Sequence, residues 1–371
     1  MKKFLAIFIT VLLFCTFSIN VCALDTSAKS AIVINGLSGS VIYSKNSDVK
    51  LPMASTTKIM TALILVEQNT PEKQVTVTDK MVRTEGSSMG LKVGDTVTYN
   101  DLLYGMMLSS GNDAANAAAL SIGGSFEGFA DIMNDKAAQL GLKNTNFVTP
   151  SGLNSDEHYT TAYDLAILTM YALRNSQFKK VCSTKEKTLC YGTPPVKHTL
   201  SNHNRILSLY DGAVGVKTGF TKAAGRCLVT AAQRENTQII AVTLNDGNDW
   251  KDHINMLDYG FNNTVDQVID PILPGRISVI GSDKDSMELY TESRTFGISA
   301  GDEITYKINL PSIVYPDIVE NDILGSVDYY CNGDFISSAP ITAKNGCTAV
   351  TDNMSMIEKI LKKFMILFRS I

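Results

Sequence analysis

The stretch LPMASTTKIMT, residues 51–61, places a serine and a lysine at the start of an expected helix. Apolar side chains recur with helical spacing from residue 56 to residue 67, so Ser55 is expected at the N-terminus of that helix. The positive end of the helix dipole favours a developing alkoxide there. Lys58 follows one turn later on the same face, where its amine can reach the Ser55 hydroxyl. The stretch therefore predicts a serine nucleophile with a lysine as its general base.

A protonated lysine is no base, so this chemistry requires burial or a second cation to lower the pKa of Lys58. The motif KTG supplies a candidate cation in Lys217, on the edge of an expected strand that follows an apolar run. Thr218 and the backbone beside it are placed to pair with an extended peptide. Gly219 leaves room for close approach. The motif thus predicts one wall of a substrate cleft.

The motif SGN at residues 110–112 lies between two runs of helical spacing. A break between helices suits a side chain that projects into a cleft. Ser110 is a candidate proton relay between Lys58 and the leaving amine. Asn112 is a candidate either to hold Lys58 or to bind a substrate amide.

Each motif taken alone is a weak signal. Ser-x-x-Lys recurs at residues 47–50 and 176–179, and Ser-x-Asn recurs at residues 18–20 and 44–46, whereas KTG occurs once. A lone copy usually marks a helix cap, a turn or the end of a strand. All three motifs, in this order and in fitting local structure, favour one shared site.

The composition is typical of a globular protein with a large core. Of 371 residues, 44% are hydrophobic and 19% are charged. The net charge is −4 and the main body has no long basic run, which argues against nucleic acid as a partner. The four histidines show no metal-ligand spacing and no Cys-x-x-Cys pair occurs, so no metal site is expected.

Residues 24–268 alternate helix-like and strand-like runs, with strands at both ends. This order predicts an α+β domain in which helices cover an antiparallel sheet. Residues 271–275, PILPG, resemble a linker, and the segment 270–350 contains short β-rich runs. Asn332-Gly333 lies between two of these runs and predicts a tight hairpin, because both residues accept positive φ. A small all-β domain is therefore expected.

Both ends of the chain predict export and contact with a membrane. Residues 1–23 have two lysines followed by an apolar run that is short for a transmembrane span, as in a cleaved secretory signal. An uncleaved anchor is the alternative. Residues 354–371 predict a helix with a cationic stripe opposite a broad apolar face, as in helices that lie in the membrane interface. Packing of this helix on the protein's own core is the alternative. A peripheral protein on the extracytoplasmic face of the bacterial cytoplasmic membrane is expected.

Five of the seven cysteines follow the predicted signal. Cys182 with Cys190, and Cys331 with Cys347, are near enough in sequence to bridge a loop or hairpin, but spacing alone leaves the connectivity open. Cys227 lies in an apolar run and is expected to be a small buried hydrophobic residue.

Together the three motifs resemble those of the serine penicillin-recognising enzymes. More closely, the chain resembles the low-molecular-weight D-alanyl-D-alanine carboxypeptidases, peptidase family S11, from about residue 31 to its C-terminus. The likeness rests on LPMASTTKIMT (51–61), LSSGNDAA (108–115), PSGL (150–153), HYTTAYDL (158–165) and GVKTGFT (215–221). The β domain and the amphipathic tail also match the family layout.

The resemblance implies a serine DD-peptidase fold and a reaction on peptidoglycan stem peptides that end in D-Ala-D-Ala. Ser55 would attack the carbonyl between the two D-alanines with Lys58 as base, D-alanine would leave, and water would hydrolyse the acyl-enzyme. Lys217, Thr218, Gly219 and Phe220 would bind the substrate. The oxyanion hole would be the backbone N–H groups of Ser55 and Phe220. β-Lactams would acylate Ser55 and leave slowly, and no cofactor is expected.

One departure from the family concerns the carboxylate at the end of the substrate. Many members carry an arginine downstream of KTG that reads this group, and Asp252 lies near that place here. Thr218 together with Lys217, Arg226 or Lys251 is the candidate replacement.

Other functions stay open beside the carboxypeptidase. A β-lactamase needs a deacylation base, commonly a glutamate ahead of KTG, and the chain offers Asp156, Glu157 and His158 there without the usual Glu-x-x-x-Asn spacing. A non-catalytic peptidoglycan-binding homologue is suggested by the missing arginine. A transpeptidase or endopeptidase would use the same acyl-enzyme.

Overall fold

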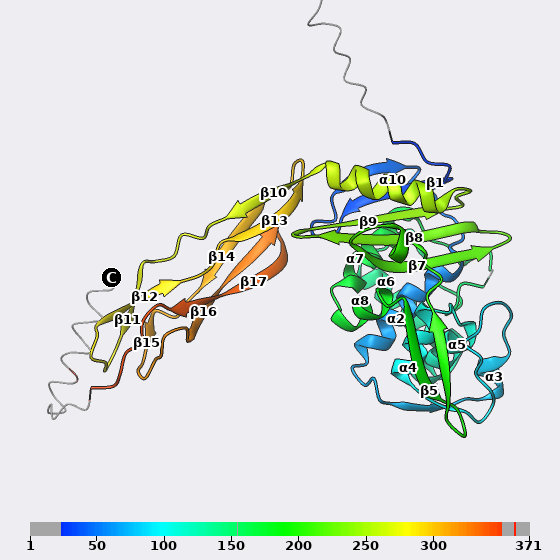
Figure 1. Cartoon of the computed structure of the whole chain (residues 1–371), viewed down its shortest axis with the longest axis horizontal. Helices are drawn as coiled ribbons and strands as arrows, with labels where there is room; N and C mark the ends of the chain where they lie inside the picture. Colours follow the sequence, from blue (N-terminus) through cyan, green and yellow to red (C-terminus); the bar gives the residue numbers. More distant parts are fainter. Residues whose placement is uncertain (1–23, 154, 351–359, 361–371) are drawn as a thin grey trace, which may run out of the picture.

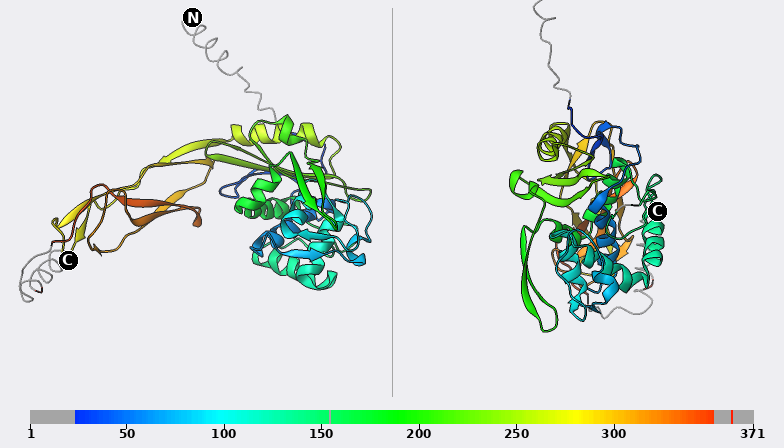
Figure 2. Two further views of the ribbon diagram at one scale, coloured as in Figure 1. Left: turned by 60° about the horizontal axis from the view of Figure 1, so that its bottom comes forward. Right: turned by 90° about the vertical axis from the view of Figure 1, so that its right-hand side faces the viewer.

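A computed structural model describes residues 24–153, 155–350 and 360. The predicted signal at 1–23 lies outside the described residues, as does all but Ile360 of the predicted amphipathic helix at 354–371. Within the described chain a sheet-and-helix domain is followed by an elongated all-β domain (Figure 1, Figure 2). The predicted α+β class is therefore confirmed. No helix in this part of the chain is long and apolar enough to cross a membrane.

The first domain contains most of the helices. They are α2 (Lys58–Glu67), α3 (Asp79–Val82), α4 (Tyr99–Met107), α5 (Asn112–Gly123), α6 (Phe126–Gln139), α7 (Ala162–Leu173), α8 (Ser176–Cys182), α9 (Ile206–Leu209) and α10 (Asp249–Asn262), with a 3₁₀ turn, η1 (Ala54–Thr57), ahead of α2. Its strands are β1 (Ser30–Asn35), β2 (Val41–Lys45), β3 (Gln74–Thr76), β4 (Thr96–Thr98), β5 (Glu186–Tyr191), β6 (Val196–Ser201), β7 (Ala213–Thr221), β8 (Gly225–Arg234) and β9 (Thr237–Leu244).

The main sheet is antiparallel, with the strand order β2-β1-β9-β8-β7. Successive side chains of a strand point to opposite faces. In β1, Ile32 and Ile34 therefore join the core that contains α2, whereas Ala31 and Val33 join the cluster under α10. Helices cover both faces, which explains why the central strands β1 and β9 are buried at nearly every position rather than at alternate ones. Strand β7 is left at one edge of the sheet.

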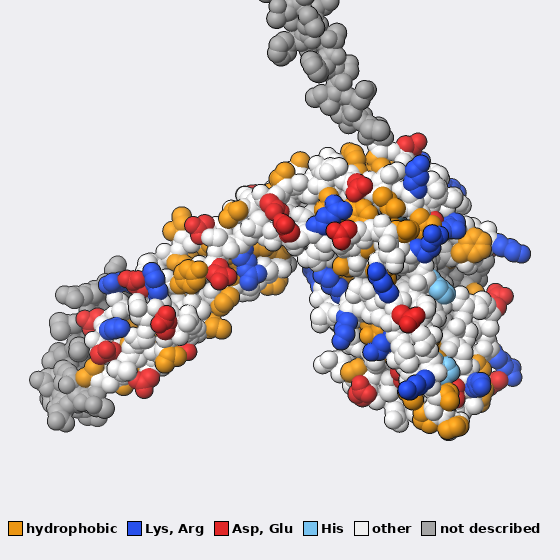
Figure 3. Space-filling view, in the orientation of Figure 1, with side chains coloured by type: hydrophobic (Ala, Val, Ile, Leu, Met, Phe, Trp, Pro, Cys, Tyr) orange, Lys and Arg blue, Asp and Glu red, His pale blue; other side chains and the backbone are white. Residues whose placement is uncertain are grey.

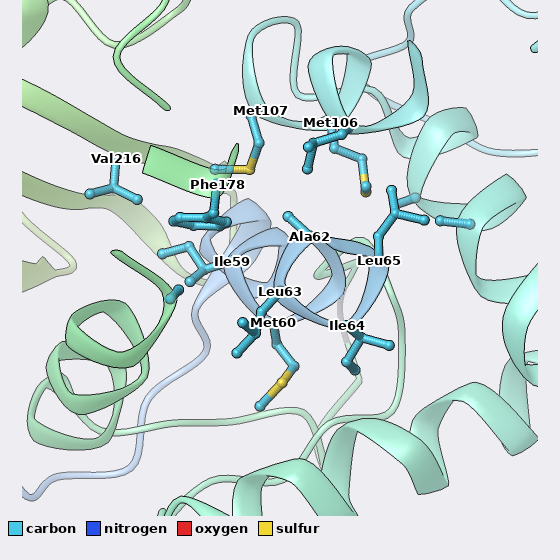
Figure 4. Packing of buried hydrophobic residues seen from close by; sticks show 14 of the residues in the cluster. Ile59, Met60, Ala62, Leu63, Ile64, Leu65, Met106, Met107, Phe178 and Val216 are labelled. Carbon is cyan, nitrogen blue, oxygen red and sulfur yellow. The ribbon is translucent and has the colours of Figure 1, made fainter. Parts of the chain in front are cut away.

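Helix α2 runs through the centre of the helical layer, and all its residues from Lys58 to Val66 are buried. Figure 4 shows its apolar side chains surrounded by neighbours that include Met106 of α4, Phe178 of α8 and Val216 of β7. A helix that is hydrophobic on every side is held by packing on every side. The lysine at its first residue is therefore carried into the protein interior.

The all-β domain consists of two sheets, whose strands pair antiparallel except for the parallel pair of β11 and β15. One pairs β10 (Thr264–Ile269) with β13 (Arg294–Ser299). The other sheet has the strand order β14-β16-β17-β12-β11-β15. Its strands are β11 (Arg276–Val279), β12 (Ser286–Tyr290), β14 (Ile304–Asn309), β15 (Ile313–Val314), β16 (Ile323–Cys331) and β17 (Asp334–Ala343). Asn332 and Gly333 join β16 to β17 with φ angles of 53° and 91°, so the predicted hairpin is confirmed. Over the face in Figure 3, charged side chains of both signs are interspersed on both domains.

The five described cysteines are all free, so neither of the pairs considered from the sequence is formed. Cys182 is buried in the core beside the helices, whereas Cys190 is exposed on β5. Cys331 ends β16, and Cys347 packs in a separate cluster with residues of β11 and β12. Cys227 is 1% exposed, as expected for a small hydrophobic residue.

Candidate active site

A cleft of about 730 Å³ opens where the edge of the main sheet meets the helical layer. It brings the three sequence motifs together. Ser55 of η1, Ser110 and Asn112 at the start of α5, and the segment 218–220 of β7 all line it. Lys58 and Lys217 lie behind this lining and are 0% and 1% exposed. Every site residue predicted from the sequence therefore belongs to one site.

Ser55 is presented by the turn η1, which leads directly into α2. The residue before it, Ala54, has a φ of 48°, a conformation that is uncommon for a residue with a Cβ. Such strain persists only where the surroundings hold it. One support is the Thr57 hydroxyl, which donates a hydrogen bond of 2.8 Å to the Ala54 carbonyl.

His158 supports the turn that presents Ser55, whereas sequence analysis considered it only as a base for the β-lactamase alternative. The backbone N–H of Val148 donates to His158 Nδ1 at 2.9 Å, which leaves the ring proton on Nε2. Nε2 lies 2.7 Å from the Thr57 hydroxyl oxygen and donates to it. Burial lowers the pKa of His158 to about 4, so the ring stays neutral at physiological pH. His158 therefore has a structural role and does not line the cleft.

The Lys58 amine is the centre of the site. Its Nζ lies 3.0 Å from the Ser55 hydroxyl, 2.7 Å from Asn112 Oδ1 and 2.8 Å from the Ser151 carbonyl. The amide and the carbonyl accept its two N–H groups when the amine is neutral, and its lone pair then faces the serine proton. Asn112 is held in this orientation because its Nδ2 donates to the Glu85 carbonyl at 2.6 Å. Of the two roles considered for Asn112, the structure supports the one that positions Lys58.

Burial lowers the pKa of Lys58 well below its ordinary value, and the nearby charge of Lys217 lowers it further, while Asp113 opposes both. Burial also lowers the pKa of Lys217, to about 7. Burial and the charge of Lys217 therefore both favour the uncharged form of the Lys58 amine. This is the condition that the sequence argument required of a lysine base.

Behind the cleft lining, Lys217 contacts the motif that contains Ser110. Its Nζ donates to the Ser110 hydroxyl at 3.0 Å and to the Thr218 carbonyl at 2.9 Å. Ser110 has a φ of 57° in the break before α5, which holds its side chain in the cleft. Among the described residues its hydrogen-bond partner is Lys217 rather than Lys58. The relay of a proton by Ser110 stays a prediction.

Gly219 explains how strand β7 reaches the serine. A Cβ at this position would lie 3.1 Å from both the Ser55 nitrogen and the Met53 carbonyl oxygen. The sequence predicted that Gly219 would leave room for a close approach. In the structure, the group that approaches is the turn that presents Ser55. Phe220, the next residue, is 66% exposed at the rim of the cleft.

The loop between α3 and β4 is anchored to the site by Asp113, which sequence analysis did not single out. Its carboxylate accepts hydrogen bonds from the backbone N–H groups of Met89, Gly90 and Leu91 and from the Ser88 hydroxyl. Gly86 and Ser87 of the same loop line the cleft. The signal available in the sequence was the acidic residue directly after the SGN motif. If buried there, its carboxylate would need several hydrogen-bond donors from a neighbouring segment.

No group of acidic, histidine or cysteine side chains suited to a metal ion is present in the described parts of the chain.

Comparisons with known proteins agree with this geometry. The sequence model for D-alanyl-D-alanine carboxypeptidase, peptidase family S11, matches residues 18–248. The carboxypeptidase DacF of Bacillus subtilis is 42% identical over 221 residues, which are 58% of this chain and 56% of that protein. The carboxypeptidase DacC of Escherichia coli is 31% identical over 341 residues, 85% of this chain and 83% of that protein. The solved structure of a Streptomyces DD-transpeptidase is 35% identical, with a TM-score of 0.61 over 64% of this chain and 98% of that one.

The fold and the three motifs around one cleft are those of the serine DD-peptidases. Since the family model matches more than half of the sequence, the chain belongs to the D-alanyl-D-alanine carboxypeptidase family, S11. It spans 56% of the length of the Bacillus relative.

Replacing Gly152 by alanine is expected to slow the reaction of Ser55 with a fluorescent penicillin by about 100-fold, the effect of a misplacement of about 1 Å. Gly152 has a φ of 85°, and a Cβ there would collide with the backbone carbonyl of Ala54 and so displace the serine turn. Gly90→Ala is the matched control, because Gly90 has a φ of 87° and open space around it. Equal slowing in both variants would contradict the steric argument.

The rate at which fluorescent penicillin acylates Ser55 should rise with pH, since only neutral Lys58 accepts a proton. The midpoint of this rise should lie well below the ordinary pKa of lysine. Lys217→Gln removes a like charge, raises the pKa of Lys58 and should move the midpoint to higher pH. Lys222→Gln, on the exposed turn after β7, is the control and should leave the midpoint in place. The measurement is the acylation rate constant from pH 5 to pH 10, and an unshifted midpoint in the Lys217 variant would refute the coupling.

Proposed function

We propose that this protein is a serine-type D-Ala-D-Ala carboxypeptidase that removes the terminal D-alanine from peptidoglycan stem peptides during cell-wall biogenesis. The observation that carries the proposal is the 3.0 Å contact between a buried lysine amine and a cleft-lining serine hydroxyl. Family membership and the relatives named carboxypeptidases support the same reaction.

In this reaction Ser55 Oγ forms a bond to the carbonyl carbon between the two D-alanines, and its proton passes to the neutral amine of Lys58. The C–N bond of the resulting intermediate then breaks. The leaving nitrogen takes a proton, either from Lys58 directly or through the Ser110 hydroxyl, and D-alanine departs. Water, losing a proton to Lys58, hydrolyses the ester and restores the Ser55 hydroxyl.

The edge position of β7 supports binding of an extended peptide. Strand β8 pairs with one side of β7, and the cleft lies along the other side. A peptide laid antiparallel to this free edge would pair with those backbone groups of β7 that point away from β8. The approach of Gly219 to the Ser55 nitrogen also brings the two proposed oxyanion donors, the N–H groups of Ser55 and Phe220, to the same end of the cleft.

The same acyl-enzyme serves a β-lactamase only where a base activates water for deacylation. Asp156, Glu157 and His158 were the candidates, and none of them lines the cleft in the described structure. The described carboxylate that does line it, Asp249, is paired with Arg226. Slow release of penicillin is therefore expected, and rapid turnover of nitrocefin would instead favour the β-lactamase.

We also propose that the protein is exported and bound to the outer face of the cytoplasmic membrane through residues 354–371. The substrate lies outside the cytoplasm, and the cationic stripe opposite an apolar face in this segment supports membrane binding.

Replacing Ser55 by alanine is expected to abolish both release of D-alanine from diacetyl-Lys-D-Ala-D-Ala and covalent labelling by fluorescent penicillin. Ser176→Ala is the matched control, since Ser176 also begins a helix and also stands three residues before a lysine. Intact mass after exposure to penicillin measures the adduct. Labelling that persists without Ser55 would assign the nucleophile to another residue. Labelling of the unchanged protein without any release of D-alanine would favour a non-hydrolytic homologue.

Deleting residues 354–371 is expected to move the mature protein from the membrane fraction to the soluble fraction, because the deletion removes the proposed interfacial helix. Fractionation followed by penicillin labelling measures the distribution. Retention on the membrane after the deletion would point to an uncleaved N-terminal segment.

A further inference from the structure

A carboxypeptidase substrate ends in a carboxylate, and the cleft contains one arginine or lysine in its described lining, Arg226. We propose that Arg226 binds the terminal carboxylate of the peptide and that Asp249 and Trp250 hold the guanidinium in place. This inference rests on the proposed carboxypeptidase function and names a specificity-determining residue for it.

The position of Arg226 follows from the register of two strands. Residue 226 of β8 lies directly opposite Phe220 of β7, so the two side chains leave the sheet on the same face. Thr218, two residues earlier on β7, lines the cleft from the same strand. The arginine therefore stands beside the KTG motif, at the end of the cleft where a peptide laid along β7 would finish.

Asp249, the first residue of α10, fixes the orientation of the guanidinium. Arg226 Nε donates to Asp249 Oδ2 at 3.0 Å, and Nη2 donates to Oδ1 at 2.7 Å. The Asp249 side chain is 7% exposed, whereas that of Arg226 is 46% exposed. In the described chain no group accepts from Nη1, so both N–H groups of that nitrogen remain for a ligand. A guanidinium held on one edge offers its other donors in a fixed plane, which suits a carboxylate.

The ring of Trp250 adds a second restraint. Its centroid lies 6.0 Å from the Arg226 guanidinium carbon, within the range of a cation–π contact, and Trp250 also lines the cleft. The Trp250 ring and the Asp249 carboxylate together restrict the orientation of the guanidinium, while the Arg226 side chain stays 46% exposed.

The other cations considered from the sequence are less suited to this role. Lys217 is 1% exposed, and its amine is bonded to Ser110 and to the Thr218 carbonyl. Lys251 does not line the cleft. Asp252 accepts hydrogen bonds from the backbone and side chain of Ser27, so it anchors the N-terminal segment rather than serving the cleft.

The ion pair with Asp249 also determines how Arg226 would recognise a carboxylate. The pair has no net charge, so recognition of the carboxylate depends on directed hydrogen bonds from Nη1 rather than on a long-range field. Loss of the Asp249 carboxylate would leave the charge of Arg226 uncompensated, but it would also release the guanidinium from the plane in which Nη1 is aimed. Asp249 is accordingly a positioning residue.

The test compares diacetyl-Lys-D-Ala-D-Ala with its C-terminal amide, which differs only in the terminal group. Arg226→Gln should lower kcat/KM for the acid by about 10- to 100-fold, the size of a lost hydrogen bond to a charged group, and leave kcat/KM for the amide unchanged. Arg226→Lys should retain part of the preference for the acid. Asp249→Asn should raise KM for the acid with a smaller effect on kcat.

Arg205→Gln is the matched control, because the Arg205 guanidinium lies 5.8 Å from the same Trp250 ring but outside the cleft lining. It should keep the full preference for the acid. Reaction with a thioester whose leaving group carries no carboxylate reports whether Ser55 remains reactive in each variant.

An unchanged acid-to-amide preference in Arg226→Gln would overturn the inference, as would an equal loss with acid, amide and thioester, which indicates a structural role. If the proposed carboxypeptidase function itself is wrong, the experiment gives a different result. In that case the unchanged protein would release no D-alanine from the acid, whatever stands at residue 226.

Discussion

The burial of one amine, that of Lys58, is the constraint on which the site depends. Removing a lysine from water disfavours its charged form, and this lowers its pKa. The neutral amine must still satisfy its N–H groups, and it does so with Asn112 and the Ser151 carbonyl. The same contacts aim its lone pair at Ser55. Desolvation, hydrogen bonding and orientation therefore act together to make a serine reactive.

This arrangement requires the sheet and the helical layer to meet closely. Gly219 brings β7 against the Ser55 turn, Gly152 passes close behind it, and His158 supports it through Thr57. Each contact joins segments that are far apart in sequence. The cleft is therefore rigid where the chemistry occurs, while the edge of β7 remains open for a peptide.

Local sequence signals predicted much of the fold. Helical spacing located α2 and the two helices on either side of the SGN motif, α4 and α5, and Asn332-Gly333 located a hairpin. The same signals were silent on short or polar elements, such as the hairpin of β5 and β6, whose strands are largely exposed. Exposed strands lack the burial pattern on which such predictions depend.

The sequence by itself determined the identities of the serine, the two lysines and the asparagine, because their spacing within each motif is local. Tertiary structure alone decided their partners: Ser110 with Lys217, Lys58 with the Ser151 carbonyl, and Arg226 with Asp249. The physical reason is that these contacts form only after the sheet packs on the helices. Helical and strand periodicity contain no information about which distant backbone carbonyl or carboxylate will face a given amine.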